Sequence, residues 1–530
     1  MVGTKIFMKT ALFHFFGFGV AYPILFTLSA SASALFVDLN STNPLAPYAD
    51  WSTAATNIQD AIDVSSDGDL VLVSNGVYQT GGRVVYGSLT NRVAITKAIT
   101  VQSVNGPSVT VIQGNSILGS NAVRCVYMTN NSVLSGFTVT NGGTLSSGDF
   151  LLEQSGGGIW TTNGSSAVVS NCVLIGNVAA DLGGGACNGI ICSSSIIQNH
   201  AYYGGGIGSM GSPSFATNCL IWSNSAAFFG GGARGLTLKN CKVLQNMASL
   251  AGGTYSGSLY GCLVASNSTS GFGIINDAHN VINCTIVNNQ AVYGPAGIDG
   301  PNTVTINSII YNNSNVSTGS PSNYLGPTIF DHCCTTPLPL TGANNITNDP
   351  GFADFANGNF QLQSNSPCIN SGDYYAFVFF IPSGYIATDL DGNPRIVDGL
   401  VDMGAYEYQK PGFILPYYWA QQYGLPEDGT IDSDGDGINN WQEAVAGTDP
   451  TDATSVLKML SVSNSPNGNI VRWQSEANKL YCLQRSTNLL ANPAFVSIYT
   501  NFLIPFPAIL VFTDKTATNG GSYFYRVGVK

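Results

Sequence analysis

Short aliphatic runs alternate with Gly and Asn corners through the middle of the chain. Seven segments align without gaps, each ending in Asn after a few apolar residues: Asn171–Asn177, Ser193–Asn199, Asn218–Asn224, Asn240–Asn246, Gly261–Asn267, Asn283–Asn289 and Asn307–Asn313. Their final asparagines recur every 21 to 25 residues. No apolar stripe has helical spacing, so the repeat is not a helical solenoid. The pattern predicts a parallel β-helix in which each repeat forms one coil.

The repeated polar residues predict the corners of these coils. Asn tolerates left-handed backbone geometry, and its amide can hydrogen-bond to the same residue one coil away. We therefore expect the recurring asparagines to form a turn and a structural ladder, rather than a ligand site. Glycine-rich segments at 156–158, 183–185, 204–206, 230–232 and 252–253 predict a second corner, where a positive φ is needed.

Five cysteines share one position of the repeat and are expected to stack inside the solenoid: Cys172, Cys219, Cys241, Cys262 and Cys284. In-register neighbours have nearly parallel Cβ vectors, a geometry that forms disulfides poorly. Free Cys is also a compact core residue. A reduced structural column is therefore favoured over disulfides or a metal site. Cys334 and Cys368 lie outside this column and are the best disulfide candidates, with Cys333 competing for the same partner.

The segment before the repeats predicts a cap for the first coil. Residues 51–64 have apolar positions at helical spacing, and Ser52 or Thr53 can serve as the N-cap. Because the open end of a solenoid needs a cover, we expect this helix to lie over the first coil. Strands are expected at 69–78 and 99–106.

Composition and charge exclude several functions. The 530 residues carry a formal net charge of −12, with 18 Lys and Arg and no basic cluster. Nucleic acids and anionic lipid surfaces are therefore not expected as partners. With 44% hydrophobic and only 9% charged residues, the chain is also not intrinsically disordered.

Residues 1–34 have the organisation of a secretory signal peptide. Lys5 and Lys9 precede an apolar run from Ala11 to Leu28, and small residues follow up to Ala34. Cleavage is expected after residue 32 or 34, and an uncleaved membrane anchor is the alternative. No later segment is long and apolar enough to be a transmembrane segment. We therefore expect a secreted or bacterial cell-surface protein.

An acidic segment near residue 440 predicts a calcium site. Its twelve residues, Asp432 to Glu443, match the spacing of a calcium loop. The expected ligands are the side chains of Asp432, Asp434, Asp436, Asn440 and Glu443 and the carbonyl of Ile438. No complete helix-loop-helix pair is present, so structural Ca²⁺ is expected, and a solvated acidic linker is the alternative.

After residue 455 the pattern changes to alternating strands, which predict a small β-sandwich. The expected organisation is a signal peptide at 1–34, a β-helix at 35–325, a C-terminal β-helix or anchor-like module at 326–410, a linker with the calcium loop at 411–455, and the sandwich at 456–530.

These motifs resemble known families. The predicted helix at 51–63, the strand at 68–78 and the coils to about residue 315 resemble exported bacterial right-handed parallel β-helix proteins of the pectin-lyase-like superfamily. Pairs of Gly-Gly-Gly with an aliphatic-x-x-Asn step are similar to repeats of polymorphic outer-membrane proteins. The motifs Ser366–Gly372, Asp389–Arg395 and Val401–Glu407 resemble the choice-of-anchor Q module, and the C-terminal strands resemble fibronectin-like modules. The resemblance implies an all-β, right-handed β-helix with an N-terminal capping helix and a C-terminal β-sandwich.

The sequence does not support a particular catalytic activity. No two acids between residues 125 and 325 share a phase in consecutive coils, Asp181 and Arg234 need not meet, and neither His200 nor His279 has a supported Ser or Cys partner. We therefore expect a non-catalytic protein for adhesion or glycan binding, with a polysaccharide or a cell-surface ligand as its partner. A polysaccharide lyase or glycoside hydrolase is the alternative. Tyr202, Tyr203, Phe228 and Phe229 precede glycine triplets, where they can stack on sugars or pack between coils.

Overall fold

The computed structural model describes residues 32–529, except for 163, 165, 211–213, 302, 327, 375–387, 398–399, 410–411, 477–478, 480, 492, 503–507 and 519–520. Most of the predicted signal peptide, residues 1–31, lies outside the described residues. Over the described part of the chain, no helix is both long and apolar enough to cross a membrane.

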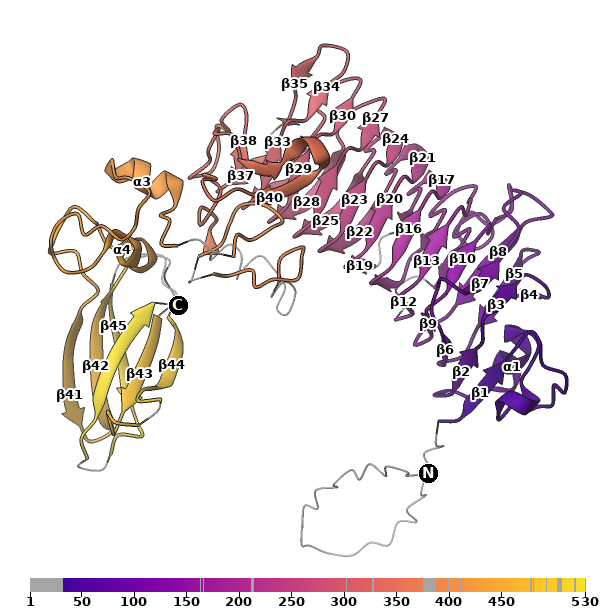
Figure 1. The fold of residues 1–530 in the computed structure, drawn as a ribbon, viewed down its shortest axis with the longest axis horizontal. Helices are drawn as coiled ribbons and strands as arrows, with labels where there is room; N and C mark the ends of the chain where they lie inside the picture. The colour runs from indigo at the N-terminus through magenta and orange to yellow at the C-terminus, as the bar shows by residue number, and fades with distance from the viewer. Residues whose placement is uncertain are drawn as a thin grey trace, which may run out of the picture.

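Three sheets run along a curved solenoid, and nearly every strand pairs in parallel with the equivalent strand of the next coil (Figure 1). The prediction of a parallel β-helix is confirmed. The 20-stranded sheet contains β1 (Ala34–Val37), β2 (Leu70–Val73), β4 (Arg83–Val84), β5 (Thr90–Ile95), β6 (Thr100–Ser103), β8 (Val123–Met128), β9 (Val133–Ser135), β11 (Ile159–Thr161), β12 (Val168–Ser170), β14 (Ala186–Cys187), β15 (Ile190–Cys192), β18 (Ile207–Gly208), β19 (Phe215–Thr217), β22 (Ala233–Lys239), β25 (Thr254–Tyr260), β28 (Ile275–Ile282), β31 (Ile298–Asp299), β32 (Val304–Ile306), β36 (Tyr324–Leu325) and β37 (Ile329–Asp331).

The two other sheets complete each coil. The 11-stranded sheet contains β3 (Gly76–Tyr78), β7 (Thr110–Gln113), β10 (Thr138–Thr140), β13 (Val173–Ile175), β16 (Ser195–Ile197), β20 (Leu220–Trp222), β23 (Lys242–Leu244), β26 (Leu263–Ala265), β29 (Thr285–Val287), β33 (Ile309–Tyr311) and β38 (Cys334–Thr335). The 7-stranded sheet contains β17 (His200–Tyr203), β21 (Ser225–Phe229), β24 (Met247–Leu250), β27 (Ser268–Thr269), β30 (Gln290–Ala291), β34 (Ser314–Asn315) and β35 (Ser320–Pro321).

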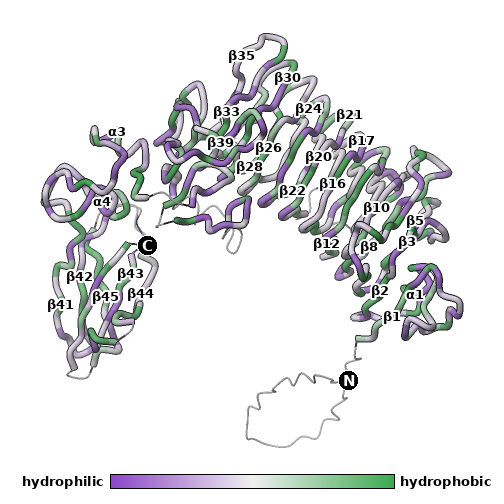
Figure 2. The backbone as a smooth tube through the Cα atoms, in the orientation of Figure 1, coloured by the Kyte–Doolittle hydropathy of each residue, from purple (hydrophilic) through white to green (hydrophobic). Residues whose placement is uncertain are grey.

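The core of the solenoid is made of in-register columns of apolar side chains. Side chains alternate between the two faces of a strand, so the central residue of each three-residue strand points inward. In the 11-stranded sheet this column is Leu174, Ile196, Ile221, Val243, Val264, Ile286 and Ile310, all fully buried. Figure 2 shows hydrophobic stretches recurring from coil to coil along the solenoid.

A buried asparagine ladder connects the coils, as predicted. Asn246 Nδ2 donates to Asn267 Oδ1 at 3.0 Å and to the Ile221 carbonyl at 2.9 Å. Its own Oδ1 accepts from the backbone and side-chain nitrogens of Asn224. The same bond links each ladder residue to the next: Asn177, Asn199, Asn224, Asn246, Asn267, Asn289, Asn313 and finally Asn323.

The prediction that the ladder asparagines themselves take the left-handed turn is wrong. For the seven asparagines from Asn177 to Asn313, the positive φ belongs to the preceding residue, for example Gln198 at 53° and Gln245 at 53°. This shift lets the ladder side chain point into the core, while its neighbour turns the chain. A different set of asparagines, in front of the cysteine column, does turn the chain at positive φ: Asn171, Asn218, Asn240, Asn283 and Asn307.

The glycine corner meets two requirements. The first glycine of a triplet has a positive φ, such as 58° at Gly204. The other two lie against the next coil, because a Cβ at Gly205 would stand 2.1 Å from the Ser225 carbonyl oxygen. Only glycine fits this close approach of one coil to the next.

The N-terminal cap is present but starts later than predicted. Trp51–Thr53 is a short 3-10 helix capped by Asp50, and α1 spans Ile58–Val64 with Asn57 as N-cap. Ala55 is extended and pairs with Val37 instead, which delays the helix. The apolar face of α1, with Ile58 and Ile62, packs into the solenoid core.

The cysteine column is confirmed as a row of free thiols inside the core. Burial is the main cause that raises the pKa of thiols such as Cys172, to about 11. Cys333 extends the column into the last coil. Cys334 and Cys368 lie close together, and their thiols are hydrogen-bonded to each other. Both are free cysteines, so the predicted disulfide is not present.

The solenoid continues past residue 326 to β38, and the module that follows β38 folds back onto the outer face of the 11-stranded sheet. It contains β39 (Phe352–Asp354), a 3-10 helix (Phe355–Asn357) and β40 (Asn359–Leu362). Phe352, Phe360 and Met403 form an apolar cluster with sheet residues such as Val287 and Ile309.

Corner asparagines tether this module to the solenoid through its backbone. The side-chain amide of Asn240 donates to the Thr388 carbonyl, that of Asn283 to the Asp402 carbonyl, and that of Asn307 to the Asp373 carbonyl. The corners of the coils therefore also hold the module in register.

A buried ionic cluster occupies the centre of the module. Arg395 donates to the carbonyls of Gly404 and Ala405 and lies 3.7 Å from Glu407 Oε2. The carboxylate of Asp402 accepts from the backbone nitrogens of Asn370 and Tyr408. Burial raises the pKa of Asp402 to about 7, and it also raises the pKa of Glu407.

The chain then passes through α3 (Tyr417–Tyr423) and α4 (Asn440–Ala446) into two antiparallel sheets. One contains β41 (Met459–Ser465), β42 (Gly468–Ser475) and β45 (Ala508–Asp514), and the other contains β43 (Tyr481–Ser486), β44 (Val496–Phe502) and β46 (Phe524–Val529). Val471, Trp473, Tyr481 and Leu483 form the core between them. The expected C-terminal sheets are confirmed, with β44 as a strand that the sequence pattern did not predict.

The asparagine ladder makes a testable prediction. Asn246→Ala should lower the free energy of unfolding by on the order of 1 to 3 kcal/mol, because buried backbone groups lose their partners. Denaturant midpoints measure this effect, and Asn121→Ala, at an exposed loop position, is the control. Equal midpoints for the two variants would contradict a stabilising ladder.

The buried carboxyl of Asp402 predicts a pH dependence. Its folded pKa lies above the ordinary value of about 3.9, so its stabilising contribution is complete below about pH 4 and is lost as the pH rises through about 7. In calorimetric scans of the full chain, Asp402→Asn should lose less stability than the parent as the pH rises. Part of the loss should remain, because the pKa of Glu407 is also raised. Exposed Asp349→Asn is the control. Parallel profiles for Asp402→Asn and the parent would refute this assignment.

Candidate functional site

The acidic loop before α4 curls around a common centre. Gly435 and Gly437 have φ of 80° and 94°, which turns the loop tightly. Asp432 holds the turn by accepting the backbone N–H of both glycines, at 2.7 and 2.9 Å. As a result, Asp432, Asp434 and Asp436 each present a carboxylate oxygen, and these oxygens lie within 4.8 Å of one another.

Glu443 supplies a fourth carboxylate from α4. Asn439 caps this helix with a capping box to Gln442, which fixes where the helix begins. The Glu443 side chain is fully buried, and burial, followed by the charges of Asp434 and Asp436, raises its pKa to about 7.

Three carboxylate oxygens in this cluster are buried and have no hydrogen-bond donor: Asp434 Oδ2, Asp436 Oδ2 and Glu443 Oε2. Leaving a buried carboxylate oxygen without a donor is costly. A cation with oxygen preference would satisfy all three at once. The arrangement is therefore suited to hold such an ion.

The other two predicted ligands lie beside this centre in different roles. Asn440 is buried, and its amide bonds both the backbone nitrogen and the hydroxyl of Ser433, at 3.2 and 2.9 Å. The Ile438 backbone N–H donates to Asp436 Oδ1 at 2.7 Å. Their roles as ligands stay predictions.

Helix α4 connects the acidic loop to the sandwich and to the α3 region. The ammonium of Lys479, in the sandwich, donates to the carbonyls of Ala444 and Val445 at the end of the helix, at 3.0 and 2.8 Å. Ala444 also packs in an apolar cluster with Leu415 and Trp419 of the α3 region. The acidic loop therefore lies next to the joint between α3 and the sandwich.

A second candidate site is an aromatic ridge on the solenoid, made of Tyr202, Tyr203, Phe228, Phe229 and Tyr255. Phe229 stacks on Tyr203 at 5.8 Å and on Tyr255 at 4.4 Å between ring centroids. Tyr202 and Phe228 lie at its exposed edge, 46% and 36% accessible. Tyr203 and Phe229 lie side by side because they occupy equivalent positions of successive coils.

A groove of about 460 Å³ lies beside the ridge, over β22, β25 and β28. Its lining includes Ser209, Arg234, Thr237, Tyr255, Ser258 and His279. The guanidinium of Arg234 lies 4.7 Å from the centre of the Tyr203 ring. Among the described residues that line the groove, none is Asp or Glu.

Sequence reasoning identified four residues of the ridge but missed Tyr255 and the groove. Tyr255 follows its glycine corner instead of preceding it, and it lies in register with Arg234. Arg234 and Tyr255 each stand two residues after the last glycine of their corner. This shared position in the repeat is the sequence pattern that could have identified Tyr255.

Two other expectations need correction. Asp181 and Arg234 do come close enough to interact, since the charge of Arg234 opposes the effect of burial, which raises the Asp181 pKa. His200 does have a serine partner, because its Nδ1 lies 2.9 Å from Ser225 Oγ on the next coil. This pair is exposed, and among the described residues no carboxylate is hydrogen-bonded to the imidazole to orient it.

One family model matches a short part of the chain. Residues 432–453, which hold the acidic loop, match the bacterial TSP3 repeat family. A search of curated protein sequences finds no match.

Three solved structures are similar to this chain at low identity. Pectate lyase Pel9A is 14% identical with a TM-score of 0.42, covering 71% of this chain and 97% of that one. A rhamnogalacturonan lyase is 12% identical with a TM-score of 0.37, covering 61% and 91%. The enzymatically active domain of bacteriophage CBA120 tailspike protein 2 is 11% identical with a TM-score of 0.26, covering 94% and 73%. Likeness at this level says nothing about what this chain binds or converts.

Proposed function

We propose that this protein is exported to the cell surface or secreted, and that it binds carbohydrate on the aromatic ridge without converting it. The observation that carries the proposal is the row of stacked rings beside an open groove. Export rests on the signal-peptide pattern of residues 1–34.

The ridge has the physical properties of a platform for sugars. An aromatic face offers an apolar surface for the C–H face of a sugar ring, and the hydroxyls of the sugar need polar partners nearby. Serines, Arg234 and His279 of the groove provide such partners. Both faces of Phe229 are covered by neighbouring rings. The exposed rings of Tyr202 and Phe228 would therefore contact the sugar. Phe229 packs against Phe228 and holds it in place, so little conformational entropy is lost when a ligand binds.

The composition of the groove favours binding over catalysis. Glycoside hydrolysis uses a pair of carboxylates, and the described lining residues include none. The alternative, a polysaccharide lyase or glycoside hydrolase, would use the same groove, with Arg234 or His279 near the substrate. Product formation separates the two functions.

The acidic loop has a structural role in this proposal. Asp432, Asp434, Asp436 and Glu443, with the Ile438 carbonyl and Asn440 as further ligands, would bind one Ca²⁺. The buried oxygens without donors support this assignment. Bound calcium would cancel the repulsion among the carboxylates, and it would keep α4 in position to hold Lys479.

The ridge proposal predicts a loss of binding in Phe228→Ala. Removing one stacking ring should cost on the order of 1 kcal/mol, or about fivefold in Kd, for a polysaccharide identified on a glycan panel. Phe524→Ala, with a comparably exposed ring in the sandwich, is the control. Unchanged affinity in Phe228→Ala would contradict the ridge. Reducing sugar or an unsaturated product from the parent protein would favour the enzymatic alternative.

The calcium proposal predicts binding with a dissociation constant on the order of 0.1 to 1 mM. Chelation should expose residues 426–450 to protease while the solenoid stays intact, because the carboxylates then repel one another. Glu443→Gln should reproduce this sensitivity in the presence of calcium.

Glu427→Gln, at an exposed position just before the loop, is the matched control and should behave as the parent. Calorimetry tests binding directly. An absence of binding heat up to about 10 mM calcium, well above the expected affinity range, would leave the segment as an acidic linker.

A further inference from the structure

A second cluster of ligand-type side chains lies where the last coil meets the C-terminal module. Asp331 ends β37, and His332 turns the chain at φ 48°. His332 occupies the coil position that Asn283 and Asn307 occupy in the two preceding coils. Asp373 comes from the module, and Asn307 brings it there by accepting its backbone N–H at 2.6 Å and donating to its carbonyl at 2.9 Å.

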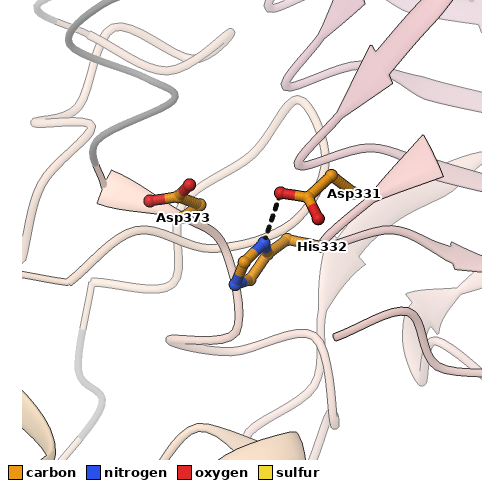
Figure 3. Close-up of side chains that lie close together, drawn as sticks. All are labelled: Asp331, His332 and Asp373. Atoms are coloured by element: carbon orange, nitrogen blue, oxygen red, sulfur yellow. Dashed lines mark hydrogen bonds and ion pairs between the residues drawn. The ribbon is translucent and has the colours of Figure 1, made fainter. Parts of the chain in front are cut away.

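The three side chains lie close together, and Asp331 contacts the His332 ring (Figure 3). His332 Nδ1 lies 2.9 Å from Asp331 Oδ2, and the ligand atoms of Asp331, His332 and Asp373 lie within 4.8 Å of one another. His332 is only 8% exposed, and Asp331 and Asp373 are half-buried. The Tyr418 ring of α3 lies edge-on to the imidazole at 5.2 Å and shields it.

The charges at this point favour a cation. Asp331 and Asp373 place two carboxylates beside one imidazole. Two carboxylates this close repel each other unless a positive charge lies between them.

We propose that Asp331, His332 and Asp373 form a binding site for a divalent transition-metal ion such as Zn²⁺. One imidazole nitrogen and two carboxylates are the mixed ligand set that zinc accepts, with water completing the shell. Oxygen-only ligation at the acidic loop and mixed ligation here select different metals.

The hydrogen-bond partner of the other His332 ring nitrogen is suited to a metal-bound imidazole. His332 Nε2 lies 2.9 Å from the Asn344 side-chain amide. When the metal takes the Nδ1 lone pair, the ring proton moves to Nε2, and the Asn344 amide, turned by half a rotation, presents its oxygen to accept it. A neutral imidazole then binds without net loss of a proton, and an imidazolium releases one.

The proposed ion would bridge separate parts of the chain. Asp331 and His332 belong to the solenoid, Asp373 to the module, and Tyr418 covers the site from α3. The ion would thus lock the module onto the last coil, independently of any ligand on the aromatic ridge.

The test uses the full-length chain with Glu443→Gln, which removes the other candidate cation site. Co²⁺ serves as the probe, because its visible absorption bands report the ligand set. We expect one equivalent of Co²⁺ with bands typical of nitrogen and oxygen ligands, and displacement by Zn²⁺. Adding His332→Asn should abolish these bands, and the fold should persist since asparagine fills this corner in other coils.

Further variants make the result specific. Asn344→Ala should weaken Co²⁺ binding about 10- to 100-fold, as expected for a partner that orients a ligand. His279→Asn, in the groove, should leave binding unchanged. Equal Co²⁺ uptake with and without His332, bands of thiolate ligation, or no uptake at all would overturn the proposal. In the last case His332 would be the counter-ion of two carboxylates.

Discussion

The asparagine ladder stacks one coil on the next, and this stacking positions the other features of the solenoid. Each ladder amide bonds the backbone of the preceding coil and the side chain of the following coil. The coils are therefore held in register, and any residue that recurs with the period becomes a column. The buried aliphatic columns, the free thiols and the aromatic ridge are all consequences of this register.

The same register gives the outside of the solenoid regularly spaced side chains to which another segment can bind. Asparagines at the other corner present their amides outward at regular intervals, and the C-terminal module binds to them through its backbone. Docking buries the ionic cluster around Arg395 and brings Asp373 beside His332. A non-repeating segment thus acquires a defined position from a repeating one.

Carboxylates lie close together in three regions: in the C-terminal module, in the acidic loop, and where the last coil meets the module. In the module, Arg395 and backbone N–H groups compensate them, and Asp402 and Glu407 still have raised pKa values. In the acidic loop, three buried oxygens lack a donor. At Asp331 and Asp373 a single imidazole lies between two acids. Cations at the latter two places would stabilise the joints on both sides of α3, and the ridge would stay free for carbohydrate.

Features that repeat or are local could be predicted from the amino-acid sequence. The period, the ladder of Asn177 to Asn313, the cysteine column and the spacing of the acidic loop are all contained in short segments, because in-register stacking and loop closure follow from residue spacing. The three-dimensional fold was needed to show which residue takes the left-handed turn, where α1 begins, and that Tyr255 completes the ridge. It alone brought Asp373 to His332, since that contact depends on how a non-repeating module docks on the last coil. Such docking is a sum of many weak contacts between distant segments, and no local pattern in the chain records it.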